Sequence, residues 1–505
     1  MNTIVTNNKD KTTSLNKNFI YNFVNQILLL IIPLITTPYL ARVLGVDING
    51  RIAFSSSITS YFILFANLGF NTLGQREIAK YRGDKEKENS IYWSIVTMKG
   101  ALTLLSVLVM MTMVLGNAFQ EKYKFFILLN LISLSNCAFD SNFFFQGIED
   151  FKSNTLKMLF AKIACMIVVF SFVKKQDDAW IYVLAYAVTL IIPSMLLWVK
   201  IIKRVGFLKI KNLSFKQYVK PSLLLFLPLV AVTLYSVFDK TMIGLLSSNP
   251  DYENGNYEQA YKLNSVILVL ITFISPVMGS RNTHDYKIGE VAKMKDHLYK
   301  VARYTWMIGI PLIVGVCILG KNLSSWFLGA GYDRVPILLS IMSVRFLSSG
   351  FSELCSTQLL LPMGKERYVT IISILGAVIN ISLNSFLIKD FGSVGAAIAT
   401  AVTEGMICIC YLILVDAKGY LKVERILKMP FKYLISAGVM ALVLLAMNRM
   451  LSYSIFTFIF MFVIGVSVYF LSLAFLKDKY YLYLVSKASN ILKRFKFRFK
   501  KSREN

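Results

Sequence analysis

The segment NFIYNFVNQILLLIIPLITTPYLA, residues 18–41, decides the class of fold, because it contains no acidic or basic side chain. A helix needs about 20 mostly apolar residues to cross the hydrocarbon core of a bilayer. Segments of this kind recur as far as Phe475. We count fourteen of them, at residues 18–41, 50–72, 91–117, 125–146, 155–173, 180–199, 221–246, 261–280, 301–319, 337–361, 369–388, 393–415, 431–450 and 453–475. The sequence therefore predicts an all-α integral membrane protein with about 14 transmembrane helices.

The charges predict the orientation of these helices. Of the residues, 56% are hydrophobic and only 16% are charged, yet the formal net charge is +27. Most of the 55 Lys and Arg lie in connectors on one side of the predicted membrane, including the tail ILKRFKFRFKKSREN at 491–505. Basic connectors stay on the cytoplasmic side. We therefore expect a multi-pass protein of the cell membrane with both termini in the cytoplasm, and the charge does not indicate a nucleic-acid partner.

Several chemical functions are excluded. The six cysteines lie in apolar runs without a CxxC pair, and the two histidines, His284 and His297, lack the spacing of metal ligands. We expect no metal site and no cofactor. The connectors are too short to hold a soluble catalytic domain, so we do not expect an enzyme.

A weak internal repeat predicts how the chain is organised. FFFQGIEDFKSNTLKMLF at 143–160 has a counterpart in LLLPMGKERYVTIISILG at 359–376, six predicted spans later. An even separation gives two halves of the same orientation, with a substrate path between them. We expect a cytoplasmic segment at 1–17, a six-helix bundle at 18–200, a basic connector at 201–220, a second six-helix bundle at 221–416, two extra helices at 417–475 and a basic cytoplasmic tail at 476–505.

Charged residues deep in the predicted spans are the candidate binding residues, because an ionised side chain is costly in a bilayer. Lys99, Lys162 and Arg345 lie too deep for their side chains to reach the headgroups easily. One interpretation is a water-filled cationic cavity that holds an anionic ligand such as phosphate. The other is a set of buried ion pairs with Asp140 or Glu353.

Further polar residues and prolines can serve transport. Asn22, Asn25 and Gln26 share one helical face and are predicted to line the cavity, or else to join helices through hydrogen bonds. The four acids within the predicted spans are candidates for binding a coupling ion, or are charge partners of neighbouring bases: Asp140, Asp239, Glu353 and Glu404. Pro33 and Pro38 predict a bend in the first span, either as a hinge or as a static kink.

The order of several motifs resembles that of the polysaccharide (Wzx-type) flippases, which belong to the multidrug/oligosaccharidyl-lipid/polysaccharide exporter superfamily. The motifs are IPLITTPYLARVLGVDINGRIAF at 32–54, ANLGFNTLGQREIA at 66–79, FFFQGIEDFKSNTL at 143–156, DKTMIGLL at 239–246, NGNYEQAYKL at 254–263, LLLPMGKER at 359–367 and FGSVGAAIATAVTE at 391–404. The resemblance extends from about residue 15 to residue 420.

The resemblance implies a V-shaped pair of six-helix bundles with two extra C-terminal helices. It implies a flippase that moves undecaprenyl-pyrophosphate-linked oligosaccharide repeat units to the outer leaflet for a surface polysaccharide such as capsule or O-antigen. A proton or Na⁺ gradient, a polysaccharide polymerase and a chain-length regulator are the implied partners, besides membrane lipids. Arg42 and Lys240 lie on the motifs themselves and join the candidate cargo-binding residues.

Three alternatives stay open. A lipid II-type or other polyprenyl-lipid flippase has an equally anionic cargo. A drug/cation antiporter of the same superfamily would be expected to rely on acidic groups, and the deep bases argue against it. A membrane polysaccharide polymerase or ligase would need a large outer loop, whereas the longest outer connector, residues 247–260, is short.

Overall fold

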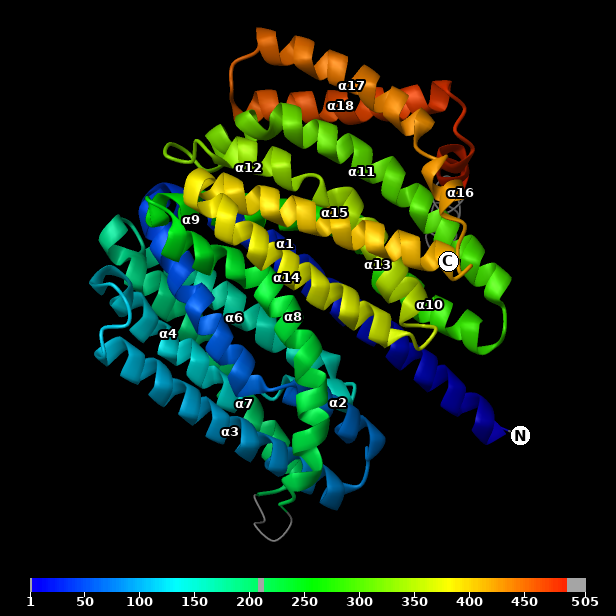
Figure 1. Cartoon of the computed structure of the whole chain (residues 1–505). Helices are drawn as coiled ribbons and strands as arrows, with labels where there is room; N and C mark the ends of the chain where they lie inside the picture. Colours follow the sequence, from blue (N-terminus) through cyan, green and yellow to red (C-terminus); the bar gives the residue numbers. More distant parts are fainter. Residues whose placement is uncertain (1, 208–212, 488–505) are drawn as a thin grey trace, which may run out of the picture. The chain divides into compact units, whose positions relative to one another are not determined.

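The chain is helical throughout its described part (Figure 1). The computed structural model describes the backbone of residues 2–207 and 213–487, and in these ranges all side chains except those of 2–31, 33, 151, 227–228, 231–232, 234–236 and 276. Every regular element in these ranges is a helix. The predicted all-α class is confirmed. The chain divides into two compact units, which are described separately.

Unit 1 comprises residues 1–259, 328–333 and 377–396. Its elements are α1 (Asn2–Asn67), α2 (Phe70–Lys80), α3 (Lys85–Leu115), α4 (Glu121–Phe139), α5 (Asn142–Gly147), α6 (Phe151–Phe172), η1 (Gln176–Asp178), α7 (Ala179–Val205), α8 (Lys216–Leu246), the first part of α9 (Pro250–Thr272) and the last part of α14 (Glu366–Phe391). In this unit α4 packs on α1 and α7, and α6 packs on α7.

Unit 2 comprises residues 260–327, 334–376 and 397–505. Beyond the rest of α9 and α14, its elements are α10 (Ser275–Lys287), α11 (Val291–Phe327), α12 (Val335–Met342), α13 (Arg345–Cys355), the π-helix η3 (Ser356–Leu360), α15 (Ser393–Ala417) from residue 397 onward, α16 (Val423–Leu427), α17 (Phe431–Met450) and α18 (Ile455–Phe475). The helices α17 and α18 run side by side (Figure 1) and pack on α11, where the Tyr469 hydroxyl donates to the Met307 carbonyl at 2.7 Å.

The polarity of the surface fits a lipid environment. The side chains of Phe386, Phe456 and Phe475 are 76%, 81% and 88% exposed, while Lys99 is completely buried and Arg345 is 6% exposed. Large exposed apolar areas mark surfaces that meet lipid or other proteins. With so many apolar helices, the chain is a multi-pass membrane protein.

Eleven helical stretches in the described part are long and apolar enough to cross a membrane, so the count of fourteen is not confirmed. The first predicted span lies mostly before Leu34, where the first of the eleven stretches begins. The fourth corresponds to α4, which carries Lys122, Lys124, Asn130 and Asn136 within 19 residues and is not among the eleven. Polar side chains of this kind lower the mean hydropathy of a short helix.

The break in α1 occurs at Gly45. The helix runs through Pro33 and Pro38, and its backbone leaves helical angles at Gly45, whose φ of 74° and ψ of 175° suit glycine. Such a break frees carbonyl groups of the preceding turn, which then need other donors. The Asn49 amide donates to the Gly45 carbonyl at 2.7 Å, and the Tyr332 hydroxyl donates to the Ala41 carbonyl at 3.1 Å.

Candidate functional site

The first polar cluster lies in unit 1 around Lys99. Lys99 on α3 donates to Asn71 Oδ1 at 2.8 Å and to the Asp140 carbonyl at 2.9 Å. The Asp140 carboxylate is ion-paired with Lys157 of α6 at 2.5 Å, and Lys157 also donates to Asn142 Oδ1 at 3.2 Å. Lys99 is therefore held by two neutral oxygens, while the acid is taken by another base. With both lysines protonated, the cluster carries a net positive charge.

The second cluster lies in unit 2 around Arg345. Its Nε donates to Glu404 Oε1 at 3.1 Å, and its Nη1 donates to Asn264 Oδ1 at 3.3 Å. The guanidinium carbon lies 5.2 Å from the centre of the Tyr261 ring, a distance typical of a cation–π contact. The other oxygen of Glu404 accepts from Ser349 at 2.6 Å. The predicted ion-pair partner, Glu353, is thus replaced by Glu404, because α13 and α15 bring these two side chains together.

A third cluster surrounds Asp239 in unit 1. Tyr257 donates to one carboxylate oxygen of Asp239, and Asn384 donates to the other at 2.6 Å. Asn384 also donates to Asn380 Oδ1 at 3.1 Å. Lys240, the next residue, forms a separate ion pair with Glu258 at 2.6 Å. The two adjacent charges therefore point to different partners, as expected for neighbours on a helix.

The other candidate residues are not part of these clusters. Lys162 is half-buried on α6, and no acid in the described part of the chain pairs with it. Glu353 is half-buried beside Ser275 and apart from the Arg345 pair. Arg42 is exposed near the break of α1, where its side chain lies against Gly329. The side chains of Asn22, Asn25, Gln26 and Pro33 lie outside the described ones, and Pro38 is half-buried in α1.

Neutral polar residues complete all three clusters, and the charge pattern of the sequence did not indicate them. Asn71 and Asn264 accept from the two deep bases, and Asn384 and Tyr257 donate to the deep acid. A usable signal was present at Asn380 and Asn384, which are spaced i,i+4 in a largely apolar helix and so share one face. Among the residues that the structure describes, no three His, Cys, Asp or Glu gather in a metal-binding group.

Comparisons with known proteins agree with these features. Residues 15–278 match the family described as "Polysaccharide biosynthesis protein". A "Putative O-antigen transporter" of Escherichia coli (strain K12) is 24% identical over 399 residues, covering 78% of this chain and 95% of the relative. A protein of the same description from Shigella dysenteriae is 24% identical over 388 residues, which cover 75% of this chain and 94% of the relative.

Two solved structures share the fold. The lipid II flippase MurJ in an inward closed conformation superposes with a TM-score of 0.74 at 18% identity, over 91% of this chain and 99% of that chain. An inward-facing multidrug resistance MATE family transporter of the MOP superfamily gives a TM-score of 0.63 at 13% identity, over 79% of this chain and 98% of that chain. These likenesses establish the architecture, and the relatives and neighbours are transporters and flippases rather than enzymes.

Proposed function

The chain belongs to the polysaccharide biosynthesis protein family of membrane transporters, and from that membership we propose that it flips undecaprenyl-pyrophosphate-linked oligosaccharide repeat units across the cytoplasmic membrane for a surface polysaccharide. The names of the two curated relatives support an O-antigen type of cargo. The proposal includes both termini in the cytoplasm, which the positive-inside distribution of charge supports.

The observation that carries the proposal is the excess of positive charge in the helices of unit 1. In the described part of the chain, Lys99 donates to two neutral oxygens, and Lys162 has no paired acid. A pyrophosphate is a compact anion whose oxygens accept from ammonium groups. Lys162, which is partly accessible, is the residue proposed to contact the cargo. Lys99 is fully buried and is proposed to act through its field.

Arg345 has a different status from the two lysines. Its charge is balanced by Glu404, so the Arg345 cluster is neutral overall. For Arg345 to bind a phosphate, the anion would have to replace a carboxylate that is already buried in place. We therefore rank Arg345 behind Lys162 as a cargo contact, and Arg42 and Lys240 stay as further members of the proposed set.

The proposed mechanism is alternating access coupled to a proton or Na⁺ gradient. Asp239 is the first candidate for the coupling site, because its buried carboxylate accepts from Asn384 Nδ2, which also donates to the amide oxygen of Asn380. Oxygen ligands of this kind suit hard cations, and a carboxylate can also take a proton. Glu353, Glu404 and Asp140 are the other candidates, and the last two already have basic partners.

The test uses a strain that lacks the endogenous copy of this chain and carries it on a plasmid. Lys162→Gln is compared with Lys152→Gln, because both residues lie on α6 and Lys152 is exposed. A charge-assisted contact is worth about 1.5–3 kcal/mol, so we expect Lys162→Gln to lower surface polysaccharide roughly tenfold or more.

Lipid-linked repeat units should then accumulate on the cytoplasmic leaflet, with an unchanged amount of protein in the membrane. Lys152→Gln should behave as wild type. Normal surface polysaccharide in the Lys162→Gln strain would contradict the cationic-cargo model. A lipid II-type cargo has the same anionic linkage, and rescue of a strain depleted of its lipid II flippase would favour that cargo.

A further inference from the structure

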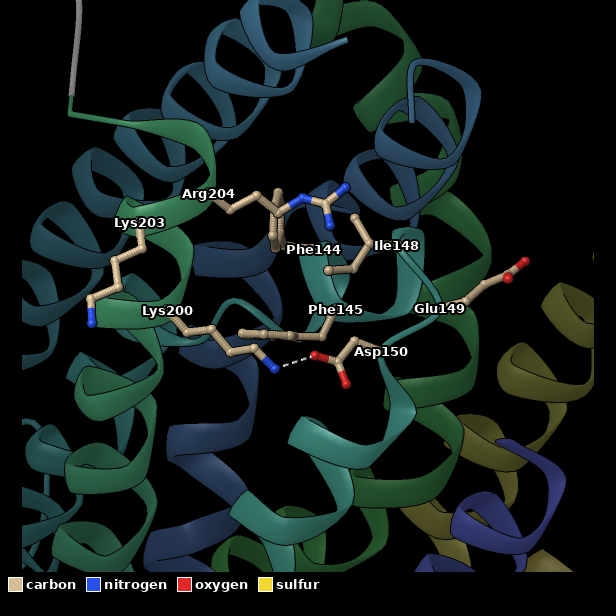
Figure 2. A pocket seen from close by; sticks show the side chains of 8 residues that line it. All are labelled: Phe144, Phe145, Ile148, Glu149, Asp150, Lys200, Lys203 and Arg204. Carbon is tan, nitrogen blue, oxygen red and sulfur yellow. Dashed lines mark hydrogen bonds and ion pairs between the residues drawn. The ribbon is translucent and has the colours of Figure 1, made fainter. Parts of the chain in front are cut away.

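A basic pocket lies in unit 1 at one end of α7. It is a cavity of about 520 Å³ between α7 and the turn that joins α5 to α6. Lys200, Lys203 and Arg204 line it from α7, while Ile148, Glu149 and Asp150 stand on the opposite side (Figure 2). The three basic residues belong to the end of a helix, and the segment 206–215 that follows it contains Lys209 and Lys211 and no acidic residue.

Two of the three cations already have acidic partners. Arg204 donates to both oxygens of Glu88, through Nε at 2.9 Å and through Nη2 at 2.8 Å. Lys200 donates to Asp150 Oδ2 at 2.5 Å. Glu149 points away from the pocket centre (Figure 2) and is ion-paired with Arg82 at 2.8 Å. These pairs hold the wall of the pocket in place.

Lys203 is the third basic residue of the pocket, and none of these ion pairs includes it. In the described part of the chain no acid lies within ion-pair distance of its ammonium group, although it lines the same pocket. The pocket therefore carries an excess of positive charge beside two fixed cations. In Figure 2 the ammonium group of Lys203 points away from the pocket centre, so an anion in the pocket meets the remaining N–H groups of Lys200 and Arg204 directly, and it meets Lys203 once that exposed side chain turns toward it.

The floor and the rim of the pocket are apolar. The Phe144 and Phe145 rings are buried beneath Arg204 and Lys200, each with its centre 5.9 Å from the cation above it. On α7, Leu196 and Val199 are 62% and 55% exposed and lie one turn before Lys200 and Lys203. Residues four apart share a helix face, so an exposed apolar strip leads directly into the basic pocket.

We propose that this pocket binds the phosphate group of an anionic membrane lipid from the cytoplasmic leaflet, with Lys203 as the main contact and an acyl chain along Leu196 and Val199. Basic pockets between helices at the cytoplasmic surface are suited to acidic lipid headgroups. The apolar strip is what distinguishes a lipid phosphate from a free phosphate ion. The choice of leaflet rests on the proposed orientation of the chain, whereas the lipid site itself does not depend on transport.

The test measures lipid binding by the purified full-length protein in neutral detergent. Native mass spectrometry counts adducts of dioctanoyl phosphatidylglycerol, with dioctanoyl phosphatidylcholine as the lipid without net charge. We expect the wild type to bind the anionic lipid more tightly, and Lys203→Gln to weaken that binding about tenfold, as the loss of one charge-assisted contact implies. Lys216→Gln is the matched control, because Lys216 is exposed at the start of α8 and does not line the pocket.

Competition identifies the source of the phosphate. Inorganic phosphate at the same concentration should not displace the anionic lipid, since it gains nothing from the apolar strip. Equal binding of the two lipids, or equal weakening by Lys203→Gln and Lys216→Gln, would overturn the site. Displacement by inorganic phosphate, or by farnesyl pyrophosphate at much lower concentration than the lipid, would assign the pocket to another anion. The experiment measures lipid binding and not transport, so its result can be interpreted even if the flippase proposal is wrong.

Discussion

The guanidinium of Arg345 and the carboxylate of Glu404 form an ion pair across two helices, with Nε 3.1 Å from Oε1 and 59 residues between them. Their side chains are 7% and 10% exposed. Both charges are satisfied further, since Asn264 accepts from Arg345 and Ser349 donates to Glu404. Such a pair fixes the position of α13 on α15. Substituting one of the two residues leaves the charge of the other buried without its ionic partner.

The pair predicts strong coupling between two substitutions. Removing one partner of a buried pair typically costs about 3–5 kcal/mol, because it leaves an uncompensated charge. We expect Glu404→Gln and Arg345→Gln each to lower the unfolding temperature of the detergent-purified protein clearly. The double variant should be more stable than the sum of the two losses implies. Additive losses in this double-mutant cycle would show that the two residues stabilise the protein independently.

Lys99→Met should affect both stability and export. The substitution keeps most of the side-chain volume but leaves Asn71 Oδ1 and the Asp140 carbonyl without their donor, at a cost of about 1–3 kcal/mol. If Lys99 also attracts the cargo, surface polysaccharide per folded molecule should fall as well. Lys152→Met is the control for loss of a lysine at an exposed site. Export that follows only the amount of folded protein would reduce Lys99 to a structural role.

Asp150 predicts a weak acid dependence of stability outside the membrane-spanning helices. Burial opposes ionisation of this carboxyl, but hydrogen bonds from Lys200 and Ser153 outweigh it and lower its pKa below 3.8. The contribution is therefore complete above the ordinary pKa and is lost as the pH falls through the lowered value. We expect the gap in unfolding temperature between wild type and Asp150→Asn to close below about pH 4.

The size of this effect is limited, because the Lys200 side chain is 56% exposed and solvent screens the pair to less than about 1 kcal/mol. Asparagine keeps the ability of Asp150 to cap α6, so the comparison isolates the charge. Asp177→Asn, at an exposed site, should leave the profile unchanged. A gap that persists at low pH would contradict the assigned cause.

The sequence was sufficient for the fold class and the family, because long apolar helices and ordered motifs are local features of the chain. It located the deep charges at Lys99 and Arg345 for the same reason. Partner choice was less predictable, because Arg345 pairs with Glu404 and not with Glu353, and Asp140 pairs with Lys157 and not with Lys99. Ion pairs form between helices, and helix spacing and rotation do not follow from one sequence.

The bend in the first helix shows a similar limit. Two prolines indicated a kink near Pro33 and Pro38, yet the backbone leaves helical angles at Gly45. A glycine in an apolar helix gives a weak signal, since many glycines stay helical. The carbonyls freed by the break accept from Asn49 and from Tyr332, which lies 291 residues after Ala41. That long-range contact is invisible before folding.

The orientation of the chain predicts opposite labelling of two exposed positions. Ser248 lies in the predicted outer connector and Ala292 in a predicted inner one, and both side chains are exposed. In a background without the six native cysteines, Ser248→Cys should react with a membrane-impermeant maleimide on whole cells. Ala292→Cys should react only after the membrane is opened. The reverse pattern would place both termini outside and would remove the pocket at Lys203 from the cytoplasmic leaflet.

Asp239→Asn should uncouple transport from the ion gradient. The variant keeps the shape of the side chain and a hydrogen-bond acceptor for Tyr257, but it can neither take a proton nor neutralise a cation. In proteoliposomes with a fluorescent polyprenyl-pyrophosphate oligosaccharide, we expect an imposed Na⁺ or pH gradient to speed wild-type translocation severalfold, whereas Asp239→Asn runs at the gradient-free rate. Glu353→Gln is the matched variant and should keep the response, because Glu353 belongs to unit 2, whereas the Asp239 cluster belongs to unit 1. If the gradient still speeds translocation in Asp239→Asn but no longer does so in Glu353→Gln, the coupling site lies in unit 2. If neither gradient changes the translocation rate of the wild type, transport is passive facilitation.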